Sequence, residues 1–348
     1  MSETLESTVF KPVQELAVDC NTPPERYIYT CSNEAIGVNP PVLDIPVIDL
    51  NSLQSSSPSA DRELEKLRAS VTSCGCFQLI GHGMTSSFLD QVSSIGRDFF
   101  ALPVKEKLKC LRTAENTQGY GHDTKFSENQ VLDWTDRLYL ITSPEDQIKF
   151  QSWPECPESF RKLLQEYTEK INLLTEAVLK VLSRSLNLKE SCFLDQYGEN
   201  AYMVARFNYY PPSPRPDLTL GVKPHADGSA MTFLIQDKQV EGLQVLKDDQ
   251  WFNVPNVPDA LLVNIGDQVE IMSNGIYKSP VHRVVTNSER ERITVAMFCS
   301  PNSSRYIEPA EELISKRRPR LYKKVNNYFD MCFEGYQHGK PAIEAAKM

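Results

Sequence analysis

From Tyr202 onward the chain is divided into short runs of β-branched and aromatic residues, separated by Pro, Gly, Asn and Asp. The runs cover residues 203–210, 231–236, 242–246, 261–265 and 292–298. Short strands at this spacing are typical of closed antiparallel folds, because a parallel sheet needs a crossover helix between strands. The pattern predicts an α+β, mainly β fold whose core is a closed sandwich or jelly roll. We expect ligands to bind inside that barrel.

Helical patterns lie on both sides of this core. Apolar residues at spacings of three and four predict a helix that begins at Asp61, and a longer stripe predicts a helix over residues 161–186 that braces a sheet. Residues 76–80 form a short apolar run that predicts a buried strand. A last helix is predicted over residues 319–336, with the basic run 316–320 as its solvated start.

We predict one integrated globular unit with three parts. Residues 1–200 form a mixed, partly helical N-terminal region that packs on the core, residues 201–305 form the β core, and residues 306–348 form a C-terminal helical region.

Charge and hydropathy exclude several classes of partner. The net charge of -9 argues against a nucleic-acid ligand, which requires a clustered basic face. No apolar stretch approaches the roughly 20 residues of a membrane span, and residues 1–10 lack the pattern of a signal peptide. The nine scattered cysteines do not form a disulfide framework. We therefore expect a soluble, cytoplasmic protein without membrane or nucleic-acid partners, and a monomer because no heptad pattern is present.

A metal site is predicted from three side chains. His225 and Asp227 are separated by one residue, which on an extended strand directs both to the same face. His282 supplies a third ligand from a second strand. Two imidazoles and one carboxylate suit Fe(II) and leave positions open, and the absence of a thiolate argues against zinc. The alternative is a loop histidine that hydrogen-bonds a nearby carboxylate. His82 lies apart from this pattern and is interpreted as structural.

A second polar pair predicts an anion site. Arg292 and Thr294 alternate on one face of an otherwise apolar strand, and a guanidinium can hold a carboxylate through two parallel hydrogen bonds. The alternative is an ion pair between Arg292 and a protein carboxylate. Alternation also gathers Arg206, Asn208 and Tyr210 on one face of their strand, and polar residues that face a barrel interior imply a ligand.

Several motifs extend these patterns over nearly the whole chain. The N-terminal ones are IPVIDL at 45–50, GCFQLIGHG at 75–83, FFALP at 99–103, QGYG at 118–121 and LDW at 132–134. The core ones are NYYPP at 208–212, HAD at 225–227, VEGLQ at 240–244, NIGD at 264–267, SNG at 273–275 and HRV at 282–284. In order and spacing they resemble the plant 2-oxoglutarate- and Fe(II)-dependent dioxygenases of specialised metabolism, and most closely the group of senescence-related and alkaloid-modifying enzymes.

The resemblance implies a double-stranded β-helix core wrapped by helices. It also implies Fe(II) on the three predicted ligands, with 2-oxoglutarate as co-substrate, its distal carboxylate on Arg292, and Thr294, Asn208 and Tyr210 nearby. The enzyme would use dioxygen, with ascorbate in support, to hydroxylate or O-demethylate a small aromatic metabolite, and release succinate and carbon dioxide. The alternatives are an oxidase of the same fold that does not use 2-oxoglutarate, and a non-oxidative metabolite-binding or lyase-like relative.

The chain departs from the family's usual pattern at Thr294, where Ser is common. Thr keeps the hydroxyl donor and adds a methyl group close to the co-substrate. We expect 2-oxoglutarate binding to be retained, although an altered oxo-acid site is the alternative.

The substrate wall is less constrained by sequence. In the family pattern the residue six positions after the anchoring arginine commonly packs on an aromatic substrate. The candidates for this wall are Phe298, Arg206, Arg137, Tyr139, Tyr120 and Phe126, of which Tyr120 and Phe126 would form a lid. The two arginines could hold a phenolate or carboxylate of the substrate. The alternatives are ordinary core packing for the aromatic residues and ion pairs with protein acids for the arginines.

Overall fold

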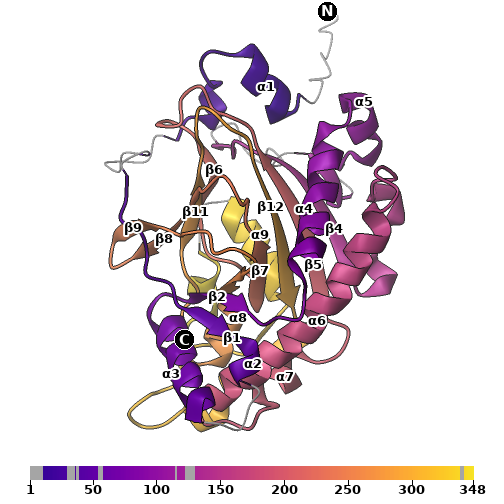
Figure 1. Ribbon diagram of the computed structural model, residues 1–348. Helices are drawn as coiled ribbons and strands as arrows, with labels where there is room; N and C mark the ends of the chain where they lie inside the picture. Colours follow the sequence, from indigo (N-terminus) through magenta and orange to yellow (C-terminus); the bar gives the residue numbers. More distant parts are fainter. Residues whose placement is uncertain are drawn as a thin grey trace, which may run out of the picture.

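Two β-sheets face each other and helices cover the outside of the larger one (Figure 1). The computed structural model describes residues 11–29, 36, 39–53, 58–113, 116–121, 130–337 and 341–348. All strand pairs in the two large sheets are antiparallel except the pair at one edge of the larger sheet.

The larger sheet has eight strands, and its edges come from the N-terminal half of the chain. Their spatial order is β1 (Val47–Asp49), β2 (Cys76–Ile80), β10 (Leu261–Ile265), β7 (Met231–Ile235), β12 (Arg292–Ser300), β5 (Tyr202–Tyr210), β4 (Asp136–Ser143) and β3 (Gly119–Gly121). Strands on both sides of residue 200 therefore share one sheet. The division of the chain at residues 200 and 305 stays a prediction.

The smaller sheet has four strands and faces the larger one. Their order is β6 (Leu220–His225), β11 (His282–Val285), β8 (Leu243–Lys247) and β9 (Gln250–Asn253). A separate two-stranded sheet joins β13 (Tyr306–Ile307) and β14 (Val325–Asn326).

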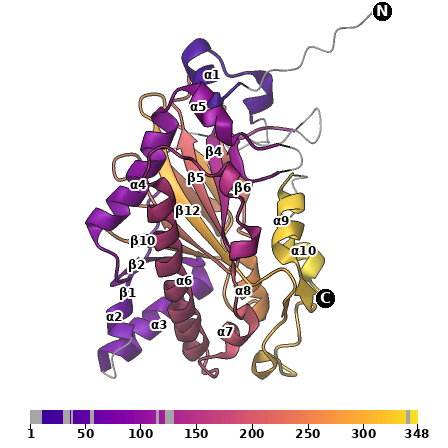
Figure 2. The same ribbon diagram turned by 90° about the vertical axis from the view of Figure 1, so that its right-hand side faces the viewer.

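Helices occupy both sides of the barrel, with α4 and α6 on one side and α9 and α10 on the other (Figure 2). The helices are α1 (Val13–Asp19), α2 (Leu50–Leu53), α3 (Pro58–Ser73), α4 (Ser86–Ala101), α5 (Val104–Lys107), α6 (Phe160–Ser185), α7 (Cys192–Tyr197), α8 (Asp267–Met272), α9 (Tyr328–Gln337) and α10 (Ile343–Ala346). Short 3₁₀ turns lie at Glu25–Tyr27, Leu108–Cys110, Glu145–Gln147, Phe150–Ser152 and Glu311–Leu313.

Strand β5 shows how alternation separates the helix-covered core from the barrel interior. Met203, Ala205, Phe207 and Tyr209 belong to the apolar cluster that includes α4 and α6. The Phe207 ring lies 5.3 Å from that of Phe160, and burial of one such side chain contributes about 1.5–3 kcal/mol. The alternate residues of β5 face the second sheet, where ligands can bind.

The fold prediction is confirmed, and two helix boundaries need correction. Helix α3 begins at Pro58 and not at Asp61, because proline suits the first turn of a helix, where its missing N–H is not needed. The predicted C-terminal helix over residues 319–336 is wrong in its first half: α9 begins at Tyr328. Residues 325–326 pair as β14, and Asn327 adopts φ 50°, a left-handed conformation that a continuous helix excludes. Residues 316–319 of the basic run are exposed, and the run begins in a turn at residues 316–317.

No helix within the described ranges combines the length and the apolar character that crossing a bilayer requires.

Candidate active site

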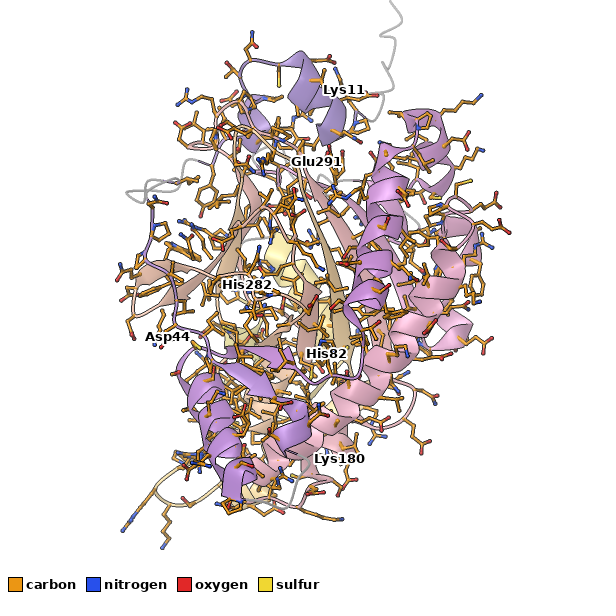
Figure 3. The ribbon with its side chains drawn as sticks, in the orientation of Figure 1. Lys11, Asp44, His82, Lys180, His282 and Glu291 are labelled. Carbon is orange, nitrogen blue, oxygen red and sulfur yellow. The ribbon has the colours of Figure 1, made fainter. Side chains whose placement is uncertain are left out.

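Three side chains with metal-ligating atoms meet at one end of the smaller sheet. The ligand atoms of His225, Asp227 and His282 all lie within 4.8 Å of one another. His225 ends β6 and His282 begins β11, and the two are paired across the ladder with ring centroids 4.2 Å apart. The Oδ1 atom of Asp227 is 3.7 Å from the Nε2 atom of each imidazole. Figure 3 shows His282 among the strands of this sheet, with His82 apart from it.

A turn after β6, and not strand parity, directs Asp227 toward the histidines. The prediction that both ligands lie on one strand is wrong for Asp227, because β6 ends at His225. The Asp227 carbonyl accepts a hydrogen bond of 2.8 Å from the N–H of Asp267, at the start of α8. A Cβ at Gly266 would lie 2.0 Å from the Ser229 carbonyl oxygen. Only glycine lets α8 approach the turn closely enough to hold it.

Backbone hydrogen bonds orient both imidazoles. Nδ1 of His225 lies 2.8 Å from the Lys223 carbonyl oxygen, and Nδ1 of His282 lies 3.0 Å from that of Pro280. These contacts place the ring proton on Nδ1, so the Nε2 lone pair is available to a metal. Burial, together with the neighbouring His282, lowers the pKa of His225 to about 3. The imidazole is therefore neutral near pH 7, as metal binding requires.

The Asp227 carboxylate provides a direct test of whether this site fits a cation. Its Oδ2 atom is buried and has no hydrogen-bond partner among the described residues. A buried polar atom without a partner costs about 1–3 kcal/mol, and more when it is charged. A divalent ion would satisfy this oxygen, and two imidazoles with one carboxylate are the donor set that suits Fe(II). The three residues thus fit iron.

The predicted oxo-acid residues form two facing pairs on β12 and β5. Arg292 lies opposite Tyr210, and Thr294 lies opposite Asn208. The Asn208 amide donates a 3.2 Å hydrogen bond to Thr294 Oγ1. This bond leaves the Thr294 hydroxyl proton free to donate to a ligand oxygen. All four residues are buried.

Arg292 is a buried cation, and no carboxylate among the described residues forms an ion pair with it. Its Nε donates to the Val240 carbonyl at 3.1 Å, whereas its Nη2 is buried and without a hydrogen-bond partner in the described part of the chain. Burial lowers the pKa of the guanidinium, which nevertheless remains charged. The nearby Asp237 carboxylate already accepts hydrogen bonds from the backbone N–H groups of Val240 and Ile293. No ion pair between Arg292 and a protein carboxylate occurs within the described ranges, which argues against that alternative.

A cavity of about 160 Å³ opens beside two of the candidate metal ligands, His225 and Asp227. It is lined by Arg112, Thr117, Arg137, Tyr139, Tyr202, Arg206, His225, Ala226, Asp227, Gly228, Phe298, Phe329 and Cys332. Four of the predicted substrate residues, Arg137, Tyr139, Arg206 and Phe298, are among them. Arg292, Thr294, Asn208 and Tyr210 do not line this cavity and lie further along β5 and β12.

Tyr120 belongs to the core and not to a lid. Its side chain is fully buried, with ring centroids 5.7 Å from Phe99 and 6.4 Å from Phe100. It lies opposite Leu138 on the adjacent strand, in the face of the sheet that packs on the helices. The prediction of a lid role for Tyr120 is therefore wrong. Phe126 lies outside the described residues.

Two sequence families match the chain. The 2OG-Fe(II) oxygenase superfamily matches residues 201–301, and the N-terminal region of the non-haem dioxygenases in morphine synthesis matches residues 45–156. Jasmonate-induced oxygenase 2 from Arabidopsis thaliana is 39% identical over 315 residues, which is 89% of this chain and 85% of the relative. Codeine O-demethylase from Papaver somniferum is 37% identical over 344 residues, 97% of this chain and 95% of the relative.

A solved structure agrees with these matches. It is described as JOX2 in complex with 2OG, Fe and JA, and it superposes with a TM-score of 0.88 at 35% identity, covering 97% of this chain and 98% of the other. The chain belongs to the 2OG-Fe(II) oxygenase superfamily. As a member of that superfamily it is a 2-oxoglutarate-dependent dioxygenase, with Fe(II) as its metal. The family, fold, enzyme class and cofactors expected from the sequence are confirmed.

The dioxygenase cavity also contains residues that sequence reasoning missed. Tyr202 shares the strand parity of Arg206, so alternation along β5 could have identified it. Phe329 and Cys332 lie three positions apart on α9, and helical spacing places them on one face. Arg112 lies in an irregular segment after a 3₁₀ turn, where no local pattern predicts its direction.

Proposed function

We propose that this dioxygenase hydroxylates or O-demethylates a small aromatic metabolite that carries an anionic group. His225, Asp227 and His282 hold Fe(II), and Arg292 with Thr294 holds the distal carboxylate of 2-oxoglutarate. Asn208 orients Thr294, and the Tyr210 ring, whose centroid is 5.3 Å from the Arg292 guanidinium carbon, flanks the arginine.

The proposal of an anionic substrate rests on the hydrogen bonds that the Arg206 guanidinium does not make. Its Nε and Nη2 atoms are buried without a hydrogen-bond partner among the described residues, and its side chain lines the cavity beside the metal ligands. Arg137 and Arg112 line the same space, whereas Asp227 is the one acidic residue among the described lining residues. A carboxylate or phenolate would satisfy the Arg206 fork through parallel hydrogen bonds.

The rest of the wall suits an aromatic body. Phe298, Phe329 and Tyr202 present rings to the cavity, and aromatic rings add about 0.5–1.5 kcal/mol to simple burial when they pack edge to face. A substrate held by its anion at one end and its ring in the middle can present only a few carbons to the metal.

The chain's own residues contribute positioning and exclusion of water. When bound, the iron and 2-oxoglutarate supply oxidation of a carbon–hydrogen bond by dioxygen, with release of succinate and carbon dioxide. The wall must hold one carbon within about 3–3.5 Å of its reaction partner. At a ring or alkyl carbon the product is an alcohol or phenol. At an O-methyl carbon the hydroxylated product sheds formaldehyde and leaves a free hydroxyl, so substrate orientation decides the outcome.

The test uses matched pairs of probes. Methoxybenzoates are compared with their neutral methoxybenzamides, and both substrate-stimulated succinate release and the change in the visible absorbance of the Fe(II)–2-oxoglutarate complex are measured. We expect the acids to bind at least tenfold more tightly, because a hydrogen bond to a charged group contributes about 1.5–3 kcal/mol. Arg206→Gln should remove this preference, whereas Arg215→Gln, which deletes an exposed arginine paired with Asp217, should not. Equal binding of acids and amides to the parent enzyme would overturn the anionic substrate.

We further propose a cytoplasmic monomer without a nucleic-acid partner. The net charge of -9 supports the absence of nucleic-acid binding. Light scattering should give the mass of one chain, 39.5 kDa, and a dimer mass would contradict the monomer.

A further inference from the structure

The reaction cavity shares a wall with a second cavity. Tyr202 and Phe329 line the cavity of about 160 Å³ beside the metal ligands, and the same two residues line a neighbouring cavity of about 90 Å³. The second cavity is polar and mostly uncharged, with amide and hydroxyl side chains such as Gln147, Asn302 and Ser303 around it. Two spaces of different chemistry are therefore separated by a pair of aromatic rings.

Phe329 is the central ring of this wall. Its centroid lies 5.5 Å from that of Tyr202 and 6.3 Å from that of Phe298, with interplanar angles of 61° and 62°. Tyr202 and Phe298 lie on the adjacent strands β5 and β12, whose backbones are fixed in the sheet. Phe329 comes from helix α9 and packs edge-on against both. Of the three, it is the ring that can be removed without altering a sheet strand.

The backbone beside Phe329 is fixed to the metal end of the molecule. The neighbouring Tyr328 hydroxyl donates a 2.8 Å hydrogen bond to the buried Asp267 carboxylate, and the N–H of Asp267 donates to the carbonyl of Asp227. Helix α9 is thus positioned by Tyr328, and the ring of Phe329 is free of that task. A substitution at Phe329 should change the wall and leave its support in place.

We propose that Phe329 is a specificity-determining residue that sets the length of the substrate. This inference rests on the proposed function, since it concerns the substrate that the cavity accepts. With the ring in place, the cavity ends at the Tyr202–Phe329 pair and takes a compact aromatic metabolite. Without it, the two spaces join, and a substrate with an uncharged, hydroxyl- or amide-bearing extension places that extension among the amides of the second cavity.

The test measures binding against substrate length. Benzoates that carry a methoxy, a hydroxyethoxy or a diethylene glycol ether group at the meta or para position are titrated into the Fe(II)–2-oxoglutarate enzyme, and the affinity is taken from the change in visible absorbance. For the parent enzyme we expect affinity to fall at least tenfold from the shortest to the longest ether. For Phe329→Ala we expect this fall to disappear, with weaker binding of the shortest ether.

Two variants serve as controls. Met331→Ala shortens an exposed side chain on the same helix that lines neither cavity, and should keep the parental length dependence. Phe329→Leu retains a partial wall and should give an intermediate dependence. A Phe329→Ala enzyme that binds Fe(II) and 2-oxoglutarate normally and keeps the parental length dependence would overturn the proposal.

The experiments distinguish failure of the proposed function from failure of the proposal that Phe329 limits the substrate length. The same ethers are run as neutral amides, so that an enzyme without preference for acids contradicts the anionic substrate while length dependence is still measured. A crystal structure of Phe329→Ala soaked with triethylene glycol gives a second readout. Continuous density through both cavities supports the proposal that the Phe329 ring separates them. A second cavity that stays closed in that crystal overturns the proposal, whatever affinities the benzoates show.

Discussion

The two ends of the proposed active site are built in different ways. At the metal and oxo-acid end, six of the seven proposed residues face one another in fixed ladder positions: His225 opposite His282, Thr294 opposite Asn208, and Arg292 opposite Tyr210. The seventh, Asp227, lies in the turn after β6. At the substrate end, the wall combines strand residues with Arg112 from an irregular segment and with Phe329 and Cys332 from α9. The comparison indicates that sheet register positions the residues proposed for iron and 2-oxoglutarate, whereas the substrate wall also depends on segments outside the two sheets.

The largest effect is expected at the metal. Asp227→Ala leaves two neutral imidazoles without the carboxylate, so iron binding and succinate release should be lost. A metal contributes several kcal/mol to such catalysis, so we expect a decrease of at least about a thousandfold in activity. Iron content and succinate release are measured, with Asp217→Ala, an exposed carboxylate of the ion pair with Arg215, as the control. An Asp227→Ala enzyme that retains iron and turnover would contradict the assignment of Asp227 as an iron ligand, and with it the comparison of the two ends.

The next effect should be confined to the oxo acid. Arg292→Ala removes a buried guanidinium, and because hydrogen bonds to charged groups contribute about 1.5–3 kcal/mol, the KM for 2-oxoglutarate should rise about 10- to 150-fold. Substrate affinity should change little, since Arg292 does not line the substrate cavity. Arg290→Ala, at an exposed position two residues earlier, is the matched control. Equal losses of 2-oxoglutarate and substrate affinity would show that the two ends are not separate.

A smaller effect concerns the support of α9 and depends on pH. Burial raises the pKa of Asp267 to about 7, well above its usual value near 4. The folded protein therefore keeps a proton that the unfolded chain releases, so the stabilisation is full below about pH 4 and is lost as the pH rises through about 7. Asn at this position stays neutral and can still accept the Tyr328 hydrogen bond.

Thermal unfolding at several pH values checks this prediction. The Tm of Asp267→Asn should match that of the parent near pH 4 to 5 and exceed it by a few degrees near pH 8, since ~1 kcal/mol shifts the Tm of a large domain by roughly 2–4 °C. Asp249→Asn, at an exposed position, should follow the parent throughout. Parallel Tm curves for parent and Asp267→Asn would contradict the raised pKa.

The smallest effect is expected at Thr294. Thr294→Ser keeps the hydroxyl that lies 3.2 Å from the Asn208 amide, so the KM for 2-oxoglutarate should change by less than about threefold. Thr294→Val keeps the shape and removes the hydroxyl, and the loss of one hydrogen bond of about 1 kcal/mol predicts a rise of about fivefold. Steady-state kinetics with varied 2-oxoglutarate measure both. A larger defect in the Ser variant than in the Val variant would show that the methyl group, and not the hydroxyl, is important.

For the residues proposed to hold the metal and the oxo acid, most of their arrangement could be predicted from the sequence. Two-residue periodicity assigns Arg292 and Thr294 to one face of a strand, and Asn208 and Tyr210 to one face of another, without knowledge of which strands pair. Pairing then follows in the structure, where β12 lies beside β5 in matching register. Asp227 shows the limit of the same reasoning: its direction comes from a turn held by α8, which is distant in sequence.

The substrate end was harder to predict because it depends on tertiary placement. The sequence predicts that Tyr120 belongs to a lid, whereas Tyr120 lies in the core, because its three-residue strand gives no indication of which face is covered by helices. Phe329 and Cys332 carry a helical pattern, but nothing local shows that this helix packs over the metal turn. The Cys332 side chain lies so close to that turn that a Cβ at Gly228 would be 2.3 Å from its Cβ.

The cross-strand pairing of His225 with His282 has a consequence for the lifetime of the protein. An ion that binds both imidazoles links strand β6 to strand β11, and it does so only in the folded state. By mass action, an ion at a hundred times its dissociation constant adds about 2.7 kcal/mol to the free energy of unfolding. A cell short of iron would therefore hold this chain in a less stable form that proteases degrade faster. The abundance of the enzyme should follow the iron supply even when its gene is expressed at a constant rate.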